Sequence, residues 1–228
     1  MRRALAITAA AAALVLRCGG VASATTTWSI EPTPILDGSQ LSGVSCLSAT
    51  SCTAVGNYLS SDGYNATLAE RWKGTKWAVQ ATQGPSGAKQ SVLHGISCSS
   101  ATACTAVGST ATPGPAGPEV PLAERWSGGR WAVAPTPSPS GSPIAYLSGV
   151  SCASKTVCTA VGEHVTSSGN YLALAEYWNG SAWRIQPTAR PATRKGLFGV
   201  WCATAGNCTA VGSATRKDDK GNALAEQT

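Results

Sequence analysis

Charged residues are scarce in this sequence of 228 residues. Asp, Glu, Lys and Arg make up 12% of the chain, and the formal net charge is +6. No run of lysines or arginines gathers this charge into the basic patch that nucleic-acid-binding proteins carry, so no nucleic-acid partner is expected. Histidine is scarcer still: His94 and His164 stand in unrelated places, which gives no sign of a metal site.

Long apolar runs are also missing, except at the N-terminus. After two arginines, residues 4–16 form an apolar stretch, and residues 22–24 are a small Ala-Ser-Ala site. This order is typical of a secretory signal peptide. The stretch is shorter than the roughly 20 residues that span a bilayer. We therefore expect residues 1–24 to be a signal peptide. Residues 25–228 are expected to form one repeat domain, secreted or associated with the cell envelope, without a membrane span.

Cys18 allows a different interpretation of the same segment, as a lipid-attachment site. Such a site needs small residues directly before the cysteine, whereas Leu16 and Arg17 precede this one. Cleavage after Ala24 would remove Cys18 and leave eight of the nine cysteines. A disulfide framework in an oxidising compartment requires an even number. The signal peptide is therefore favoured, and lipid anchoring at Cys18 stays open.

An internal repeat occupies the rest of the chain. Each copy reads Leu-x-Gly-Val/Ile-x-Cys, then Cys-Thr-Ala-Val-Gly, then Leu-Ala-Glu, and finally Trp-x-Val/Ile-x-x-Thr after a glycine turn. The fourth copy stops within its third segment, and residues 28–33 hold an isolated copy of the last segment. The copies cover about 41–82, 93–136, 147–188 and 197–228, the last completed by 28–33.

The four segments of each copy have the composition of β-strands. They are five or six residues long, rich in Val, Trp, Thr and Tyr, and bounded by Gly, Pro, Ser or Asn. Four antiparallel strands per unit at this period predict an all-β fold, a β-propeller of four-stranded blades. Residues 28–33 predict that an N-terminal strand completes the fourth of four blades and closes the ring. A pair of packed sheets, an open array and a truncated copy of a larger propeller remain alternatives.

Each copy carries two cysteines in the spacing Cys-x5-Cys, at the end of its first segment and the start of its second. A disulfide there would close the tip of a hairpin and stabilise it by roughly 2 to 3 kcal/mol in the chain-entropy model. Zinc sites use closer spacings with further Cys or His ligands nearby. No metal is therefore expected. The predicted disulfides are Cys46/Cys52, Cys98/Cys104, Cys152/Cys158 and Cys202/Cys208.

Tryptophan and glutamate also recur at fixed places in the copies. Tryptophans that bracket the glycine turn are expected to pack between blades, and the alternative is that they stack on sugars. A glutamate recurring in every copy is expected to be a structural hydrogen-bond acceptor, since catalysis would use one site and not four. The tryptophans are Trp72, Trp77, Trp126, Trp131, Trp178 and Trp183, and the glutamates are Glu70, Glu124, Glu176 and Glu226.

The unit Gly-Val-Ser-Cys-x5-Cys-Thr-Ala-Val-Gly followed by Leu-Ala-Glu-Arg-Trp-x-Gly-x-x-Trp resembles that of secreted actinobacterial repeat proteins. This resemblance covers essentially all of residues 28–228. More distantly the repeat is similar to sialidase-type propellers with Asp-box (BNR-like) repeats and to photosystem assembly-factor propellers. Aligning the Asp-box pattern on Gly74 and Trp77 puts Trp72 where the Asp should be, so the motif does not imply glycosidase activity.

The connections between the second and third segments carry most of the variation between copies. Because antiparallel strands reverse direction, these connections emerge on the side opposite the cysteine pairs. They cover residues 57–67, 109–121, 163–173 and 213–223. Loops on a rigid scaffold are where function usually lies. We therefore predict binding residues there, namely Tyr58, Asp62, Tyr64, His164 and Tyr171.

These observations favour a non-catalytic binding or scaffold module whose partner is an extracellular polysaccharide or protein. The alternative is a glycoside hydrolase or lyase of sialidase-like propeller type, which needs two carboxyls roughly 5 to 9 Å apart. In that hypothesis Asp62 and Glu163 would converge across a ring face. The sequence has no phosphate-binding glycine loop, Gly-x-Ser-x-Gly or His-Glu-x-x-His motif, so no cofactor and no catalytic residue are assigned.

Overall fold

The structure is a computed structural model, which describes residues 27–111, 117–189, 194–215 and 221–228. Every regular element within these ranges is a β-strand. The all-β prediction is therefore confirmed for this part of the chain. The expected signal peptide, including Cys18, lies outside the described residues. No helix that could cross a membrane is found among them.

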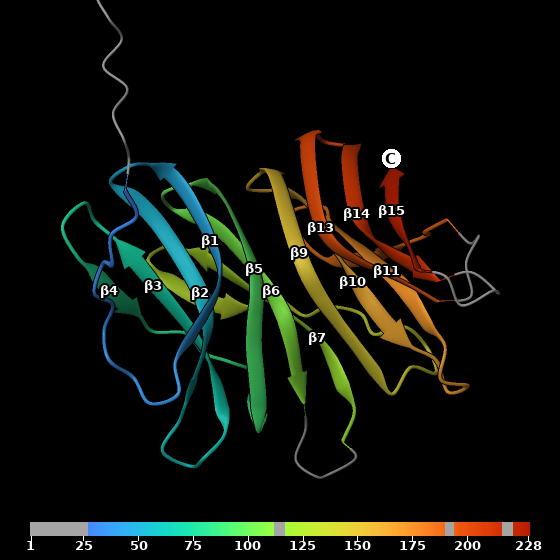
Figure 1. The fold of residues 1–228 in the computed structure, drawn as a ribbon, viewed down its shortest axis with the longest axis horizontal. Helices are drawn as coiled ribbons and strands as arrows, with labels where there is room; N and C mark the ends of the chain where they lie inside the picture. Colours follow the sequence, from blue (N-terminus) through green and yellow to red (C-terminus); the bar gives the residue numbers. More distant parts are fainter. Residues whose placement is uncertain (1–26, 112–116, 190–193, 216–220) are drawn as a thin grey trace, which may run out of the picture. The chain divides into compact units, whose positions relative to one another are not determined.

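The strands follow the sequence repeat, and within each repeat every strand pairs antiparallel with the next one (Figure 1). Repeat 1 contains β1 (Gln40–Ser48), β2 (Ser51–Leu59), β3 (Asn65–Trp72) and β4 (Trp77–Gln80). Repeat 2 contains β5 (Gln90–Ser100), β6 (Ala103–Ala111), β7 (Glu119–Ser127) and β8 (Arg130–Val133). Repeat 3 contains β9 (Ile144–Ser154), β10 (Val157–Val165), β11 (Tyr171–Trp178) and β12 (Trp183–Gln186). Repeat 4 contains β13 (Arg194–Thr204), β14 (Asn207–Thr215) and β15 (Gly221–Gln227).

The first two strands of each repeat are longer than the five or six residues expected from the sequence, because the glycine of Cys-Thr-Ala-Val-Gly does not end a strand. A Cβ on Gly56 would lie 1.8 Å from the carbonyl oxygen of Gln40. The pairing shifts by one residue between Leu41 and Gly43, which is a β-bulge. Glycine thus permits a close approach between the strands, and the ladder continues to Leu59.

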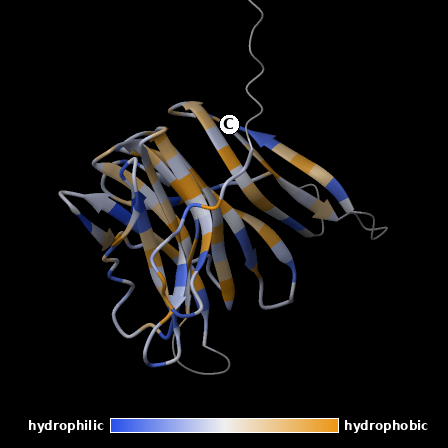
Figure 2. Cartoon of the chain, turned by 60° about the vertical axis from the view of Figure 1, so that its left-hand side comes forward, coloured by the Kyte–Doolittle hydropathy of each residue, from blue (hydrophilic) through white to orange (hydrophobic). Residues whose placement is uncertain are grey.

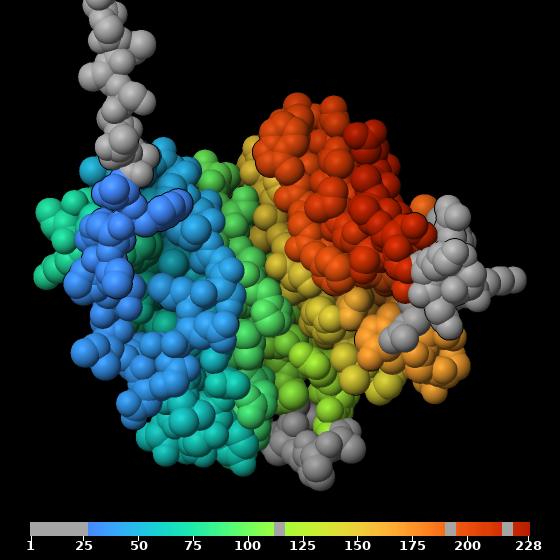
Figure 3. Space-filling model, viewed as in Figure 1, coloured from blue at the N-terminus to red at the C-terminus, as the bar shows by residue number. Residues whose placement is uncertain are grey.

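The inner strands β1, β5, β9 and β13 lie side by side in sequence order (Figure 1). In the space-filling view, the repeats accordingly follow one another as bands of successive colour, from blue to red (Figure 3). A second glycine makes this arrangement possible. A Cβ on Gly95 would lie 2.9 Å from the carbonyl oxygen of Ser148 and 3.1 Å from the Cα of Gly149. Gly43 and Gly149 approach the following repeat in the same way, so the neighbouring sheet requires each of these glycines.

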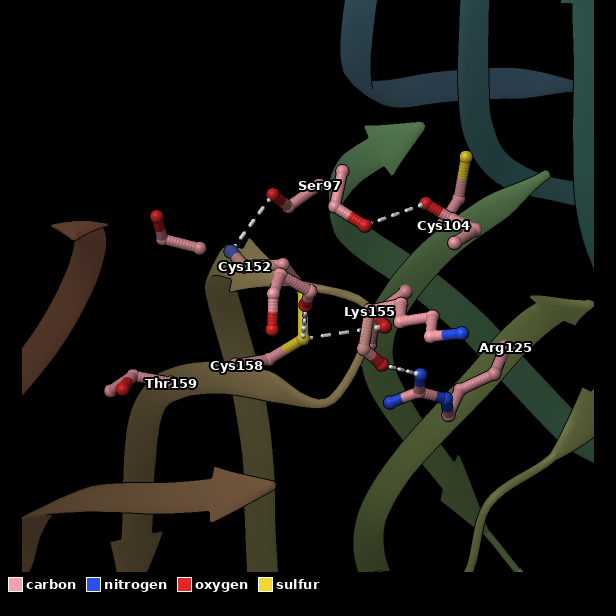
Figure 4. The surroundings of a disulfide bond; sticks show 12 residues. Ser97, Cys104, Arg125, Cys152, Lys155, Cys158 and Thr159 are labelled. Atoms are coloured by element: carbon pink, nitrogen blue, oxygen red, sulfur yellow. Dashed lines mark hydrogen bonds between the residues drawn. A yellow bond between two sulfur atoms is a disulfide. The ribbon is translucent and has the colours of Figure 1, made fainter. Parts of the chain in front are cut away.

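A hydrogen bond recurs across the same three junctions. The Ser97 hydroxyl accepts a bond of 3.0 Å from the Cys152 amide, and Figure 4 shows the two groups facing each other. The other two bonds, also 3.0 Å long, join the Cys98 amide to Ser45 and the Cys202 amide to Ser151. A buried amide without a partner would cost about 1 to 3 kcal/mol. The serine therefore helps to fix the register between neighbouring sheets.

The hydrophobic core lies between successive sheets. Val55, Val107 and Val161 project from the second strands of repeats 1 to 3 and are at most 1% exposed. They pack against leucines on the first strand of the next repeat, which are Leu93, Leu147 and Leu197. Trp131 and Trp183 are buried in two of these clusters, as the core interpretation of the tryptophans predicts. Figure 2 shows hydrophobic and polar bands alternating along the strands that build this core.

All four expected disulfides are formed. In every repeat the two cysteines are directly opposite each other in the first hairpin. No cluster of three or more metal-ligating side chains occurs in the described ranges. The pairs are Cys46–Cys52, Cys98–Cys104, Cys152–Cys158 and Cys202–Cys208, as the Cys-x5-Cys spacing predicts.

The second cysteine of the pair in repeats 2 to 4 also packs between neighbouring sheets. Cys104 and Cys158 are 4% and 1% exposed, and both belong to the hydrophobic clusters between sheets. The Sγ atom of Cys158 also lies 3.6 Å from the Thr105 hydroxyl of the preceding repeat. Cys208 is buried too and lies 3.4 Å from the Thr159 hydroxyl in the same way. These sulfur atoms are therefore part of the junctions, because the preceding repeat packs over them.

The expected closure of the ring by an N-terminal strand is not formed. Residues 27–36 contain no strand. In repeat 4, β15 pairs with β14 and with no further strand of the described residues. The inner strands join β1 to β5, β5 to β9 and β9 to β13. The sheets are thus open, as in the open-array alternative.

We predict that Gly95→Ala lowers the free energy of unfolding by about 2 kcal/mol, because the new methyl group overlaps the backbone of repeat 3. Gly199→Ala is the matched control. At this equivalent position in repeat 4, a Cβ would meet only the Val211 side chain, at 3.4 Å. Urea unfolding in dilute solution, followed by tryptophan fluorescence, measures both variants. Equal losses of stability would contradict the role of the glycine in the junction.

Candidate functional site

The two ends of the sheets differ in how closely the repeats agree. One end carries the disulfide hairpins and the glycine turns, which are nearly the same in every copy. The opposite end carries the turns at residues 60–64 and 166–170 and the connections from one repeat to the next. At this second end, which we call the loop end, repeats 3 and 4 bring together polar residues that the other copies lack.

Glu163, near the end of β10, is the centre of this group and is only 9% exposed. The hydroxyl of Tyr146 on β9 donates a hydrogen bond to its Oε1 atom. Its Oε2 atom lies against Gly196 of β13, where any Cβ would overlap the carboxylate. The glycine backbone therefore makes room for the carboxylate, and the phenol orients it.

Burial controls the protonation of the neighbouring groups. Burial, followed by the hydrogen bond to Glu163, raises the pKa of Tyr146, so the phenol stays protonated and remains a donor. Burial lowers the pKa of His164, so that its ring is neutral at pH 7. The Nδ1 atom of His164 lies 2.7 Å from the Ser142 hydroxyl. Both aromatic groups are therefore uncharged at neutral pH.

Lys195, at the start of β13, lies on the other side of this group and is 5% exposed. Its ammonium group donates to the carboxylate of Glu226 at 2.5 Å and to the carbonyl oxygen of Ala189. Glu226 also accepts a bond of 3.3 Å from the Ala189 amide. A buried ammonium needs such partners, so its charge is balanced by Glu226.

Two adjoining clefts open at the loop end of repeats 3 and 4. The first, which we call the Glu163 cleft, has a volume of about 340 Å³. The second has a volume of about 490 Å³ and includes His164, Leu172, Pro187 and Lys195. The Glu163 cleft offers hydroxyl groups, a carboxylate and an ammonium group to a ligand. It is lined by Glu163, Tyr171, Lys195, Gly196, Ser213 and Thr215.

The residues predicted in repeat 1 lie together in a separate cleft. Tyr58, Asp62 and Tyr64 line a space of about 290 Å³. The Ser60 hydroxyl bonds the carboxylate of Asp62 at 2.5 Å and lowers its pKa. The Lys89 ammonium lies 4.7 Å from the centre of the Tyr64 ring, a cation–π contact.

The predicted residues therefore form two groups, not one. His164 and Tyr171 line clefts of repeat 3, and both belong to strands because the β10–β11 hairpin extends further than expected. Tyr58 likewise lies on β2, while Asp62 and Tyr64 lie in the turn. Asp62 and Glu163 line different clefts, so the pair of carboxyls required by the glycosidase hypothesis is not brought together.

The predicted structural cysteines lie apart from both groups. Cys104 and Cys158 are covered within the junctions, and their sulfur atoms are bonded in disulfides. Neither cysteine lines the Glu163 cleft or the cleft of repeat 1. Their part in the site is therefore indirect, because they help to hold the sheets that carry it.

Sequence reasoning missed Tyr146, Lys195 and Gly196 as site residues. The available signal was their departure from the repeat. Where repeat 4 has Lys195 and Gly196, repeat 2 has Ser91 and Val92. This long charged side chain next to a glycine distinguishes the first strand of repeat 4 from that of repeat 2.

The recurring glutamates were expected to be structural hydrogen-bond acceptors, and among the described residues Glu226 meets this expectation whereas Glu124 and Glu176 do not. Glu70, Glu124 and Glu176 are at most 1% exposed. Glu226 accepts a hydrogen bond from the backbone amide of Ala189. Neither carboxylate oxygen of Glu124 has a hydrogen-bond partner among the described residues, and the same holds for Oε2 of Glu70. Ala189 directly follows the threonine that ends the last segment of repeat 3. Glu226 thus links repeat 4 to the chain leaving repeat 3.

Glu176 cannot make this link, since Pro137 follows the corresponding threonine and proline has no amide hydrogen. Neither carboxylate oxygen of Glu176 has a hydrogen-bond partner among the described residues. Burial alone raises the pKa of Glu176 to about 8. In the folded protein this carboxyl therefore stays protonated at neutral pH.

Comparisons with known proteins identify no family. No protein-family model matches the chain, and no curated protein does. The resemblances to secreted actinobacterial repeat proteins and to sialidase-type propellers are thus without sequence support from these comparisons. Among solved structures the chain is similar to "YCF48 bound to D1 peptide", with a TM-score of 0.40 and 12% sequence identity. The match covers 86% of this chain and 55% of that one, so this chain spans about half of its length.

We predict that Glu176→Gln removes a pH dependence of stability. The pKa of Glu176 lies near 8 in the folded protein, and its ordinary value is 4.5. Between pH 4.5 and pH 8 the folded protein therefore holds a proton that the unfolded chain has lost. Wild-type stability is then full below about pH 4.5 and falls as pH rises toward 8, by up to about 1.4 kcal/mol per pH unit. Urea unfolding from pH 4 to 9 measures this.

The exposed Glu31→Gln is the control for the same change of charge. It should follow the wild-type profile, whereas Glu176→Gln should gain stability over the wild type above pH 7. A Glu176→Gln profile parallel to the wild type would show that this carboxyl does not titrate in the folded protein.

Proposed function

We propose that this protein is a secreted, non-catalytic binding module of the cell envelope or extracellular space, and that it holds a polysaccharide at the loop end of repeats 3 and 4. The four disulfides are consistent with an extracellular location. The signal peptide expected at residues 1–24 supports export. The resemblance of the repeat to secreted actinobacterial proteins supports the same assignment, with the repeats as blades of a propeller-type fold.

The observation that carries the proposal is the Glu163 cleft. Glu163 is held by the Tyr146 phenol and the Gly196 backbone, and it lines a polar space together with Tyr171 and Lys195. A structural role shared by all repeats does not explain it, because the corresponding residue in repeat 1 is an asparagine. A carboxylate positioned at one copy of a repeated scaffold is what a binding site requires.

The charges favour a neutral sugar over an anionic ligand. The ammonium of Lys195 is already paired with the carboxylate of Glu226. The carboxylate of Glu163 therefore gives the three side chains one net negative charge. Sugar hydroxyls donate well to a carboxylate, and such charge-assisted bonds contribute roughly 1.5 to 3 kcal/mol. Tyr171 adds an aromatic side chain with a polar tip to the same wall.

The test is a glycan array probed with the exported protein and with two variants. Glu163→Gln keeps the shape of the side chain but removes its charge, and it should weaken binding of a neutral glycan at least tenfold, or about 1.4 kcal/mol. Lys155→Ala is the control, since Lys155 is an exposed residue at the disulfide end. It should bind like the wild type.

Two outcomes would overturn this assignment. Binding that Tyr58→Ala/Tyr64→Ala abolishes and Glu163→Gln leaves intact would move the site to the cleft of repeat 1. The second outcome is that no glycan binds and a protein is captured from envelope extracts instead. The ligand would then be a protein and not a polysaccharide.

A further inference from the structure

A wide cleft opens at the disulfide end, where repeat 1 meets repeat 2, and it belongs to neither of the sites at the loop end. It has a volume of about 520 Å³. We call it the Trp126 cleft, after the residue that repeat 2 contributes from β7. Repeat 1 contributes residues of β2, β3, β4 and the adjoining turns, among them Thr50, Ser51, Arg71, Lys73 and Gln80.

The charged groups that line this cleft are all positive. They are the guanidinium of Arg71 and the ammonium of Lys73, and the described residues of the lining include no Asp, Glu or His. Arginine pairs with a carboxylate or a phosphate through two parallel hydrogen bonds, and lysine adds a point charge. The cleft therefore favours an anionic group.

Arg71 is held in place by the neighbouring repeat. Its Nη1 atom donates a hydrogen bond of 2.8 Å to the carbonyl oxygen of Ala101, which follows β5 in repeat 2. The five N–H groups of a guanidinium form a rigid planar fork. Fixing one nitrogen therefore restrains the others, so that less entropy is lost when the fork binds an anion.

The next junction, between repeats 2 and 3, contains the same two residue types but closes the space between them. There Arg125 donates to the carbonyl oxygen of Lys155, as Figure 4 shows. Its guanidinium carbon lies 4.3 Å from the centre of the Trp178 ring, and Trp178 is only 9% exposed. In the first junction Arg71 makes the equivalent bond, yet Trp126 is only partly buried and lines an open cleft. The indole is thus available to a ligand at one junction and covered by arginine at the other.

Trp126 is supported from the core side. Its ring centre lies 5.8 Å from that of Trp131, which is fully buried. The Nε1 atom of Trp131 donates a bond of 3.3 Å to Oε1 of Gln80, where repeat 2 has Ala134 in place of the glutamine. The core interpretation therefore holds for Trp131, whereas stacking on a sugar, the alternative considered for the tryptophans, is open to Trp126.

We propose that the Trp126 cleft binds an acidic sugar residue of a polysaccharide, one that carries a carboxylate or a phosphate group. The anion pairs with Arg71 and Lys73, and the sugar ring packs on Trp126. The hydroxyls of Thr50 and Ser51 then bond the hydroxyl groups of the sugar. This site does not rest on the proposed sugar binding in the Glu163 cleft, which lies at the opposite end and favours a neutral sugar.

The test is isothermal titration of the full, exported chain at about 0.15 M salt, where charges more than about 8 Å apart are largely screened. The carboxylate probe is polygalacturonate, with galactan as its neutral counterpart. The phosphate probe is a phosphorylated mannan, with plain mannan as its counterpart. We expect the chain to bind at least one acidic polymer and neither neutral one in this cleft, and the polymer that binds identifies the anion.

Three variants assign this binding to the cleft. Arg71→Ala removes the fork and should weaken binding of the acidic polymer at least tenfold. Trp126→Leu keeps an apolar side chain against the core but removes the flat ring, and it should weaken binding to a similar extent. Lys73→Ala changes an exposed turn residue and leaves the junction untouched, so it should weaken binding without affecting the fold.

Two control variants should bind the acidic polymer like the wild type. Arg184→Ala removes the same charge from an exposed position of β12, outside the cleft. Glu163→Gln alters the proposed neutral-sugar site, so its effect separates the two sites. Equal losses in Arg71→Ala and Arg184→Ala would show only a general attraction between a basic protein and a polyanion. Binding lost in Glu163→Gln and kept in Arg71→Ala, or no acidic polymer bound at all, would also overturn the proposal.

Discussion

The approach of one repeat's inner strand to the next is the constraint on which the rest of the structure depends. Gly95 lies so close to the backbone of repeat 3 that a single methyl group would overlap it. Beside it, the Ser97 hydroxyl accepts from the Cys152 amide. Since the same pair of contacts recurs at three junctions, each sheet is placed by its predecessor. The valine and leucine clusters between the sheets follow from that placement.

This constraint divides the molecule into a uniform end and a variable end. The disulfide hairpins lie next to the serine bonds, so their geometry is tied to the junction and repeats with it. The loop end lies on the far side of the β-bulge at Gly56 and its equivalents. The glycine and serine contacts of the junction therefore do not hold it. There Glu163 of repeat 3 meets Gly196 of repeat 4, while repeats 1 and 2 carry different side chains. A repeated core can therefore support one site that is not repeated.

The parts of this structure that depend on local spacing were predictable from the sequence. Cysteine pairs at a fixed separation predicted the disulfides, and short β-rich segments predicted the antiparallel meanders. The burial of Cys104 and Cys158 was not predictable, because it depends on the preceding repeat and not on the hairpin. Strand ends were missed because Gly56 acts in a bulge and looks like a turn residue in the sequence. The expected ring closure was wrong, since closure depends on the angle between sheets, which no single segment encodes.

The candidate site was predicted only in part, for a related reason. His164 and Tyr171 stood out because they appear in one copy and lie where loops were expected. Their partners Tyr146 and Lys195 come from first strands, which the sequence marks as structural. Only the packing of repeat 3 on repeat 4 shows that these strand ends meet.

Amide hydrogen exchange of the cysteines, measured by NMR on the monomeric chain, tests the junction most directly. The amides of Cys98, Cys152 and Cys202 donate to serines of the preceding repeat, and they should exchange slowly. Cys46 occupies the same position in repeat 1, where no repeat precedes it among the described residues, and its amide should exchange much faster. Equal exchange at all four cysteines would contradict the claim that the serine bonds join the repeats.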